Sequence, residues 1–243
     1  MLARMRPLLL QFLADVPRAL PSSCALCGKE HDAALCDSCH AQFFTMEKQR
    51  CTCCGIPVSG AARDTVCGDC LKQPPAFDAT IVATDYAPPI DQLVLGLKFG
   101  SRLETAPLLA QLLHRATKGM RLPHLLTATP LGPQRLVERG FNQALEIAKP
   151  LSRSMRLALD SRLIVRYRET HAQAMLHPDE RRDNIRNAFV VPPSSMGRVR
   201  GRHIGVVDDV MTTGETLNEI AATLKRFGAT RVTNIVFART PHR

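Results

Sequence analysis

The sequence lacks long hydrophobic runs and is poor in aromatic residues. None of its apolar stretches approaches the ~18 residues needed to cross a bilayer, which excludes a membrane span. The 243 residues contain no tryptophan and two tyrosines, and aromatic residues make up 5% of the chain. The remaining composition, 45% hydrophobic and 22% charged, is that of a globular protein and argues against disorder or a coiled coil.

The amino-terminal segment lacks the features of an export signal. Gln11 and Asp15 interrupt its apolar residues, and no Ala-x-Ala cleavage site follows. Its leucines, methionines and Phe12 recur at helical spacing instead, which predicts an amphipathic helix within residues 1–23, packed on the body of the protein. We therefore expect a cytoplasmic protein.

Positive charge is concentrated in one part of the chain. Residues 1–70 are balanced in charge, so the net charge of +10 arises entirely from residues 71–243. Residues 151–200 alone hold ten arginines against five acidic residues. Such a segment attracts anionic ligands or nucleic acid, or is simply a solvated basic surface. Only Tyr167 and Phe189 lie among these arginines, so a base-stacking surface has little support.

Cysteine is absent outside residues 24–70, where eight of nine cysteines form four Cys-x-x-Cys pairs. Two residues between thiolates allow both to reach one tetrahedral ion, and two such pairs complete a closed four-sulfur site. Without an export signal, a reducing compartment favours zinc over disulfides or a redox dithiol. The predicted ligands are, for one ion, Cys24, Cys27, Cys36 and Cys39 and, for the second, Cys51, Cys54, Cys67 and Cys70.

Pairing the knuckles in order gives a double zinc ribbon over residues 24–72, although crossed pairing satisfies the same spacing. Cys53 is left over, and we expect it to be a spare thiol rather than an alternative ligand to Cys54. Because a four-sulfur site has no open position for water, both zinc ions are expected to be structural. The ribbons carry no excess positive charge with which to grip phosphates.

After the linker at residues 73–77, short β-branched runs alternate with longer amphipathic segments, which predicts a mainly parallel α/β domain over residues 78–243. The expected strands span residues 80–84, 125–129, 163–166, 204–207 and 232–237. The expected helices span residues 89–97, 103–116, 133–148 and 215–227.

The most informative segment is an apolar strand that ends in Asp208 and Asp209 and is followed by a turn and a helix. Ligands of open α/β sheets bind at the carboxyl ends of strands. Two adjacent carboxylates can accept hydrogen bonds from the paired 2′ and 3′ hydroxyls of a ribose, and they also suit hydrated Mg²⁺. Alternatively, the two acids simply end a strand.

Val210 and Met211 connect the acidic pair to Thr212, Thr213, Gly214, Glu215 and Thr216 at the start of the next helix. Free backbone N–H groups and the helix dipole attract a phosphate there, the threonine hydroxyls add donors, and a glycine allows close approach. A capped helix without a ligand is the simpler alternative. Together the acids and this loop predict a cradle for ribose 5-phosphate.

This segment resembles the signature of type I phosphoribosyltransferases, which bind phosphoribosyl pyrophosphate with Mg²⁺. Three further segments, at residues 130–143, 168–173 and 181–189, resemble the ComF family of competence proteins, and the Arg-Gly-Phe-Asn-Gln element at residues 139–143 is specific to it. With the double zinc ribbon the resemblance covers almost the whole chain. It implies a Rossmann-like type I phosphoribosyltransferase fold preceded by a small amino-terminal double zinc ribbon module.

The resemblance also implies roles for individual residues. Asp208 and Asp209 would hold the ribose, and residues 212–216 would hold the 5-phosphate. Pro130, Leu131, Arg135 and Arg139 match the family's loop and arginines for the departing pyrophosphate, and Lys98 is a weaker candidate; the alternative for these cations is a solvated surface role. No residue is marked as a general base, and histidines 171, 177 and 203 are expected to be structural or surface groups.

Three functions follow from the residues and the resemblance. The first is a phosphoribosyltransferase-type enzyme, or a former enzyme, that binds phosphoribosyl pyrophosphate and acts in DNA uptake and natural transformation. The second is a module for single-stranded DNA that keeps the transferase fold as a scaffold without turnover. The third is a sensor of phosphoribosyl pyrophosphate that contacts proteins of the DNA-uptake machinery through its zinc ribbons.

Overall fold

The computed structural model describes residues 23–44, 48–59, 65–100, 102–167 and 187–241. The chain divides into two compact units, residues 1–46 and residues 47–243. The amphipathic helix predicted for residues 1–23 lies almost wholly outside the described residues. Within the described residues, no helix combines the length and the apolar character needed to cross a membrane.

The first unit contains two Cys-x-x-Cys pairs and a short helix. The first pair turns tightly because the N–H of Gly28 donates to the carbonyl of Cys24 at 2.9 Å, and Gly28 has a φ of 71° that favours glycine. Helix α2 (Asp37–Phe44) follows and places Cys39 on its buried side. This unit therefore holds all four cysteines of the first predicted zinc site.

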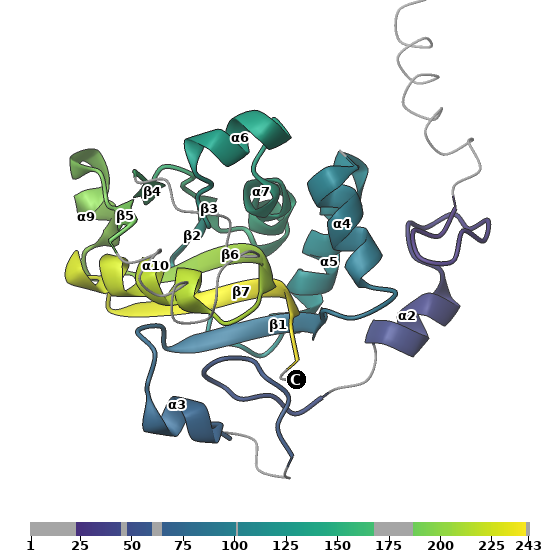
Figure 1. The fold of residues 1–243 in the computed structure, drawn as a ribbon, viewed down its shortest axis with the longest axis horizontal. Coiled ribbons are helices and arrows are strands. Elements are labelled where there is room, and N and C mark those ends of the chain that lie inside the picture. The colour runs from purple at the N-terminus through teal and green to yellow at the C-terminus, as the bar shows by residue number, and fades with distance from the viewer. Residues whose placement is uncertain (1–22, 45–47, 60–64, 101, 168–186, 242–243) are drawn as a thin grey trace, which may run out of the picture. The chain divides into compact units, whose positions relative to one another are not determined.

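The second unit is built on a five-stranded sheet with all strands parallel (Figure 1). The strand order is β1-β7-β6-β2-β3. The bounds are Ala79–Asp85 for β1, Leu125–Ala128 for β2, Ala158–Leu159 for β3, His203–Met211 for β6 and Arg231–Arg239 for β7. The α/β fold with a parallel sheet that the alternating pattern predicts is thereby confirmed.

Helices cover the sheet on both faces. Helices α5 (Ala106–Ala116) and α7 (Gln143–Met155) pack on each other. α5 also packs on β1 and β7, α7 packs on β6 and β2, and α10 (Glu215–Arg226) packs on β7. Ile204 and Val206 of β6 share a core with residues of α10, so the alternate residues Gly205 and Val207 face the opposite layer. Gly205 is required there, because a Cβ would lie 2.6 Å from Leu126 Cδ2.

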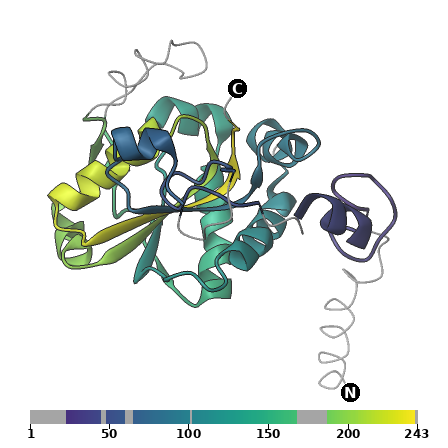
Figure 2. The same cartoon turned by 90° about the horizontal axis from the view of Figure 1, so that it is seen from below.

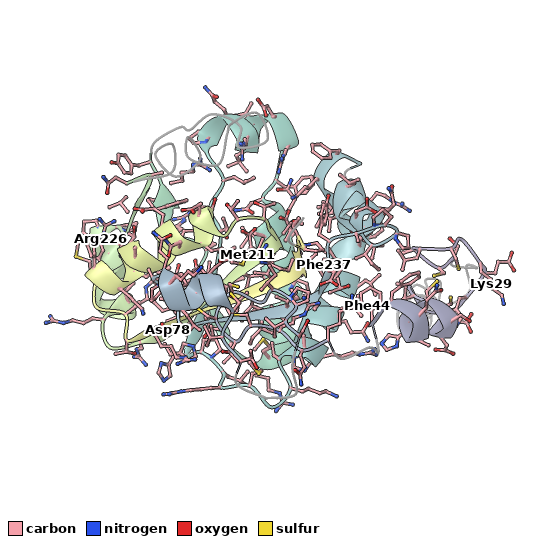
Figure 3. The ribbon with its side chains drawn as sticks, turned by 60° about the horizontal axis from the view of Figure 1, so that its bottom comes forward. Lys29, Phe44, Asp78, Met211, Arg226 and Phe237 are labelled. Carbon is pink, nitrogen blue, oxygen red and sulfur yellow. The ribbon has the colours of Figure 1, made fainter. Side chains whose placement is uncertain are left out.

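The second cysteine segment belongs to the core of this unit. Cys51, Cys54, Ile56 and Cys70 are buried in one cluster with residues of α10, β6 and β7. The segment lies beside β1 in both views (Figure 1, Figure 2), and the N–H of Thr80 donates to the carbonyl of Thr52 at 3.3 Å. Helix α3 (Gly68–Lys72) ends the segment and carries Cys70. Phe237 and Met211, labelled in Figure 3, are among the buried side chains of the same unit.

Three differences from the expected elements are informative. The helix expected at residues 133–148 is two helices, α6 (Pro133–Arg139) and α7, because Gly140 adopts a φ of 74° and Asn142 caps α7. The segment at residues 163–166 does not join the main sheet, since β4 (Val165–Arg166) pairs with β5 (Phe189–Val190) in a separate antiparallel ladder. The fifth strand is β3, whose two residues show no recognisable alternation.

The remaining elements connect these layers. Helix α4 (Asp91–Phe99) follows β1, and the short η1 (Leu103–Thr105) leads into α5. After β5, η3 (Pro193–Ser195) and α9 (Met196–Val199) return the chain to the amino end of β6. The carboxyl ends of β1, β2, β6 and β7 consequently lie along one edge of the sheet, since all four strands run in the same direction.

Candidate functional site

The two aspartates stand at the carboxyl end of β6. The N–H of Asp209 donates to Oδ1 of Asp208 at 2.9 Å, and the N–H of Val210 donates to Oδ1 of Asp209 at 2.6 Å. Lys98 Nζ, from the end of α4, lies 3.0 Å from Asp209 Oδ1. The backbone thus orients both carboxyl groups, and a cation from a distant part of the sequence pairs with one of them.

Burial sets the protonation of Asp208. Desolvation and the nearby charge of Asp209 raise the pKa of Asp208 to about 7, although Lys98 acts in the opposite direction. Two carboxyl groups this close do not both ionise readily unless cations or hydrogen-bond donors approach them. The two carboxyl groups can therefore accept hydrogen bonds from a hydroxyl-bearing ligand or bind a divalent cation at this edge of the sheet.

The loop after β6 has the geometry of an anion-binding helix start. Gly214 has a φ of 90°, and a Cβ at this position would lie 2.5 Å from Met211 Cε. Helix α10 begins at the next residue, and the N–H of Asn218 donates to the carbonyl of Gly214 at 2.8 Å. Thr212 and Thr213 are exposed. Backbone N–H groups and exposed hydroxyls therefore meet at the amino end of a twelve-residue helix.

The two predicted arginines come from α6, a helix without buried residues. Arg139 donates to Gln143 Oε1 at 3.0 Å, and its guanidinium lies 5.4 Å from the centre of the Phe99 ring. Arg135 lies one turn earlier on the same helix and is half-buried. Both arginines line the same cavity as the acidic pair.

All residues predicted from the sequence to bind substrate or act in catalysis line this cavity, whose volume is about 260 Å³. They come from α4, the β2–α6 connection, α6, β6 and the start of α10. Further lining residues that the sequence did not single out are Tyr86, Thr129, Asn142, Gln143, Ala144, Arg166 and Leu217.

Some of these further residues carry a signal in the sequence. Asn142 and Gln143 belong to the Arg-Gly-Phe-Asn-Gln element, and Asn142 Nδ2 donates to the carbonyl of Thr129 at 3.0 Å. Tyr86 directly follows β1. Because parallel strands end at the same edge of a sheet, its position in the sequence also predicts that it lies near the site. Arg166 has no such signal, because its strand lies outside the main sheet.

His203 lies at the opposite, amino end of β6. It is buried and its Nε2 lies 2.8 Å from Thr233 Oγ1, which agrees with the expected structural role. Histidines 171 and 177 lie outside the described residues.

The cysteines form two clusters in the order of the chain. The first joins Cys24, Cys27, Cys36 and Cys39, and the second joins Cys51, Cys54, Cys67 and Cys70, each with its sulfur atoms within 4.8 Å of one another. The separations of 3.8 Å between Cys27 and Cys36 and of 3.6 Å between Cys54 and Cys67 match the ~3.8 Å spacing of sulfurs around tetrahedral zinc.

Backbone N–H groups favour the thiolate form of one cysteine in each cluster. Burial alone would raise the pKa of Cys24, but N–H groups including that of Cys36, at 3.4 Å from its sulfur, lower it to about 6. The N–H groups of Cys54 and Cys67 act in the same way on Cys51 and lower its pKa to about 7. All nine cysteines are free thiols, and Cys53 lies outside both clusters. The donor sets therefore fit two structural zinc ions rather than disulfides.

Two family models match different parts of the chain. Residues 16–71 match the double zinc ribbon domain family, and residues 142–243 match the phosphoribosyl transferase domain family. A solved glutamine phosphoribosylpyrophosphate amidotransferase from B. subtilis is similar at 18% identity over 53% of this chain and 25% of its own, with a TM-score of 0.36, which is too low to support any statement about function.

Curated relatives match over most of their length. The DNA utilization protein YhgH of Escherichia coli O157:H7 is 39% identical over 212 residues, which are 85% of this chain and 90% of that protein. YhgH of Salmonella typhimurium is 36% identical over 91% of this chain and 98% of its own, and competence protein F of Haemophilus influenzae is 33% identical over 82% and 87%. The chain belongs to the ComF family, which includes YhgH and competence protein F.

Proposed function

We propose that the cavity at the end of β6 binds phosphoribosyl pyrophosphate together with Mg²⁺. One observation carries the proposal: a single cavity brings together an acidic pair, the backbone N–H groups at the start of a helix, and four cationic side chains. The acids match the ribose hydroxyls, the loop at residues 212–216 matches the 5-phosphate, and the cations match a departing pyrophosphate.

The residues also fit a magnesium ion. Asp208 and Asp209 supply carboxylate oxygens, the ligand type that Mg²⁺ prefers, and phosphate oxygens of the substrate would complete its coordination. When bound, the ion would neutralise charge that develops on pyrophosphate. Lys98, Arg135 and Arg139 of the chain would also neutralise charge on the pyrophosphate. The acidic pair would position the sugar.

The reaction that this arrangement supports is phosphoribosyl transfer. A nitrogen nucleophile forms a bond to the anomeric carbon while the bond from that carbon to the pyrophosphate oxygen breaks, and pyrophosphate leaves with the bonding electrons. The proton of the nucleophile passes to solvent or to a basic group. Fixed positive charge around the leaving group favours this step because negative charge accumulates there.

Titration calorimetry on the zinc-loaded chain tests the binding. We expect heat on addition of phosphoribosyl pyrophosphate in the presence of Mg²⁺ and a loss of affinity of at least about tenfold in Asp208→Asn and Asp209→Asn. Glu104→Gln is the matched control, since Glu104 is an exposed carboxylate that pairs with Arg102. Absence of heat with the wild-type protein would overturn the proposal.

The relatives are named for DNA utilization and for competence, and we propose that this chain also acts in the uptake or use of DNA, in the cytoplasm. A second candidate function, binding of single-stranded DNA on the transferase fold as a scaffold, is favoured by the arginines of residues 151–200. Filter binding of single-stranded DNA at about 50 and 200 mM salt distinguishes this second function from the first. The scaffold function predicts a steep loss of DNA affinity with salt that Asp208→Asn leaves unchanged.

A further inference from the structure

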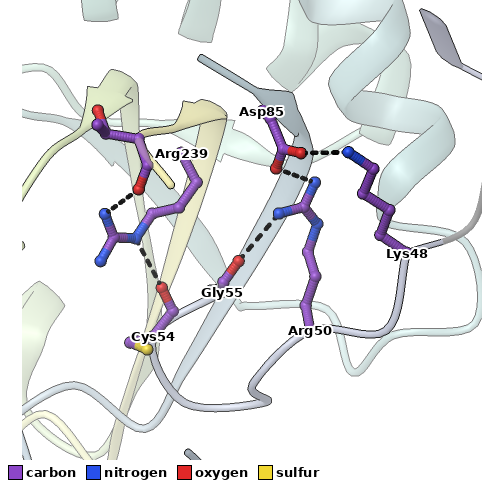
Figure 4. Close-up of polar contacts among 7 residues, drawn as sticks. Lys48, Arg50, Cys54, Gly55, Asp85 and Arg239 are labelled. Carbon is purple, nitrogen blue, oxygen red and sulfur yellow. Dashed lines mark hydrogen bonds and ion pairs between the residues drawn. The ribbon is translucent and has the colours of Figure 1, made fainter. Parts of the chain in front are cut away.

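Arg239 is a buried arginine at the end of β7 whose hydrogen bonds go to backbone carbonyls. It is 4% exposed, and it donates through Nε to the carbonyl of Cys54 at 3.1 Å. Its Nη1 donates to the carbonyls of Met211 at 3.1 Å and Thr240 at 2.9 Å and also to that of Thr212. Figure 4 shows its guanidinium beside Cys54.

These acceptors belong to two different structures. Cys54 is a ligand of the second four-cysteine cluster, whereas Met211 and Thr212 lead directly into the phosphate-binding loop. The guanidinium is a rigid planar fork, so it fixes the knuckle carbonyl and the loop carbonyls relative to each other. A buried arginine also benefits from negative charge nearby, and four thiolates around one divalent ion supply it.

A second set of contacts holds the same knuckle against β1. Arg50 donates to the carbonyl of Gly55 at 3.1 Å and pairs with Asp85 at 2.8 Å, and Lys48 pairs with the other oxygen of Asp85 at 2.6 Å (Figure 4). Burial opposes ionisation of Asp85, but these two cations hold its pKa below the usual range. A Cβ on Gly55 would lie 2.5 Å from Val82 Cγ2, so the knuckle is in direct contact with the strand.

The ends of the strands complete the connection. The N–H of Tyr86, which lines the cavity, donates to the carbonyl of Arg239 at 2.8 Å, and the N–H of Thr240 donates to that of Met211 at 3.0 Å. Displacement of the knuckle therefore strains the ends of β1, β6 and β7 together. The binding loop lies at the end of this chain of contacts.

We propose that Arg239 is a positioning residue that couples the second four-cysteine site to the loop at residues 212–216, so that zinc at Cys51, Cys54, Cys67 and Cys70 strengthens anion binding in the cavity. This inference rests on the proposed function for the identity of the anion. By linkage, the anion must in turn stabilise zinc in that cluster and leave the cluster of the other unit unaffected.

Alkylation of cysteines in the presence of a chelator that binds zinc but not Mg²⁺ tests the coupling in the wild-type chain. Peptide mass spectrometry follows each cluster separately. We expect saturating phosphoribosyl pyrophosphate with Mg²⁺ to slow alkylation of Cys67 and Cys70 by about tenfold and to leave Cys27 and Cys36 unchanged. Binding of the ligand without any change at Cys67 and Cys70 would overturn the inference while leaving the proposed function intact.

The Arg239→Lys variant keeps a positive charge but loses the planar set of N–H donors of the guanidinium. It is expected to retain both zinc ions, to bind the ligand about tenfold more weakly, and to lose the protection of Cys67 and Cys70. Arg102→Lys, at an exposed arginine, is the control. A residue that only stabilises the fold would lower the melting temperature without altering the affinity of the folded protein.

Hydrogen exchange without ligand tests the inference even if phosphoribosyl pyrophosphate does not bind. Removal of zinc by chelator, or the Arg239→Lys substitution, is expected to speed amide exchange about tenfold or more at residues 211–216, under conditions where the unit stays folded, and to speed it more there than in α5. Equal exchange of the loop with and without zinc would refute the coupling, and it would do so independently of any result on the ligand.

Discussion

At the scale of single residues, the chemistry depends on Asp208 and on the groups that set its charge. Its pKa is raised to about 7, first by burial and then by the charge of Asp209, whereas Lys98 lowers it. A folded-state pKa above the ordinary value means that ionised Asp208 costs stability, and this cost grows as pH rises from about 4 to about 7. A ligand that donates hydrogen bonds to the carboxylate of Asp208 offsets part of this loss of stability.

Ligand affinity should consequently depend on pH. We expect the affinity for phosphoribosyl pyrophosphate with Mg²⁺ to rise roughly tenfold between pH 6 and pH 8, as Asp208 ionises. In Lys98→Met the midpoint moves to higher pH, because the cation that lowers the pKa of Asp208 is lost. Lys149→Met, at an exposed lysine paired with Glu146, is the control for calorimetric titrations at each pH. Identical midpoints in the two variants would contradict this account.

His203 gives a second dependence on pH, in stability. Burial, and then the charges of Arg231, Arg121 and His124, lower the pKa of His203 to about 4. Below about pH 6.5 His203 is protonated in the unfolded chain, whereas the folded protein keeps it neutral down to about pH 4. Stability that is present above pH 6.5 is therefore lost as pH falls toward 4. We expect His203 to contribute a loss of about 2 kcal/mol between pH 7 and pH 5, measured by urea unfolding. His203→Gln should lose less stability over the same range, and equal losses would count against the buried neutral state.

The sequence identifies residues of the site best where they are contiguous. The acidic pair and residues 212–216 follow one another along the chain, so their chemistry can be inferred from order alone. Tyr86 and Arg166 reach the cavity only through the packing of separate elements. The contacts of Arg239 could not be inferred either, because its partners lie in segments distant in sequence and are backbone carbonyls that any residue provides.

At the scale of elements, the long strands and helices are predictable and the breaks between them are not. β6, β7 and α10 carry clear apolar periodicity, which is why their positions are expected correctly. The periodicity of residues 133–148 runs through Gly140, which hides the boundary between α6 and α7. That break matters, because it turns the end of α6 so that Arg139 and Asn142 both line the cavity.

Asn142 joins the two helices to the sheet edge. Its Oδ1 accepts the N–H of Leu145 at 3.2 Å, and its Nδ2 donates to the carbonyl of Thr129. Asn142→Ala should cost about 1 kcal/mol for the lost cap and lower the melting temperature by about 2–4 °C. Ser154→Ala, at an exposed position near the end of the same helix, is the control in calorimetric scans. An unchanged melting temperature in Asn142→Ala would show that the cap is not needed.

At the scale of the whole molecule, the two cysteine clusters belong to different units. The first lies within residues 1–46, whereas the second shares its core with β6, β7 and α10. Structural zinc contributes directly to folding, so its loss should affect the unit that contains it. The double ribbon is one motif in the sequence, but its two halves belong to separate compact units.

Loss of each zinc ion should therefore have different consequences. Cys54→Ser is expected to remove one zinc ion and lower the melting temperature of the transferase unit by about 10 °C or more, because several kcal/mol are lost. Cys27→Ser is also expected to remove one ion but to leave that transition within about 2 °C. Metal analysis with scanning calorimetry measures both, and equal shifts in the two variants would contradict the assignment of the clusters to separate units.

The most direct measurement of the central claim is a crystal structure of the zinc-loaded chain soaked with phosphoribosyl pyrophosphate and Mg²⁺. We expect the ribose hydroxyls within hydrogen-bonding distance of Asp208 and Asp209, and the 5-phosphate on the N–H groups of residues 213–216. A ligand bound elsewhere, with both carboxylates still facing an empty cavity, would contradict it.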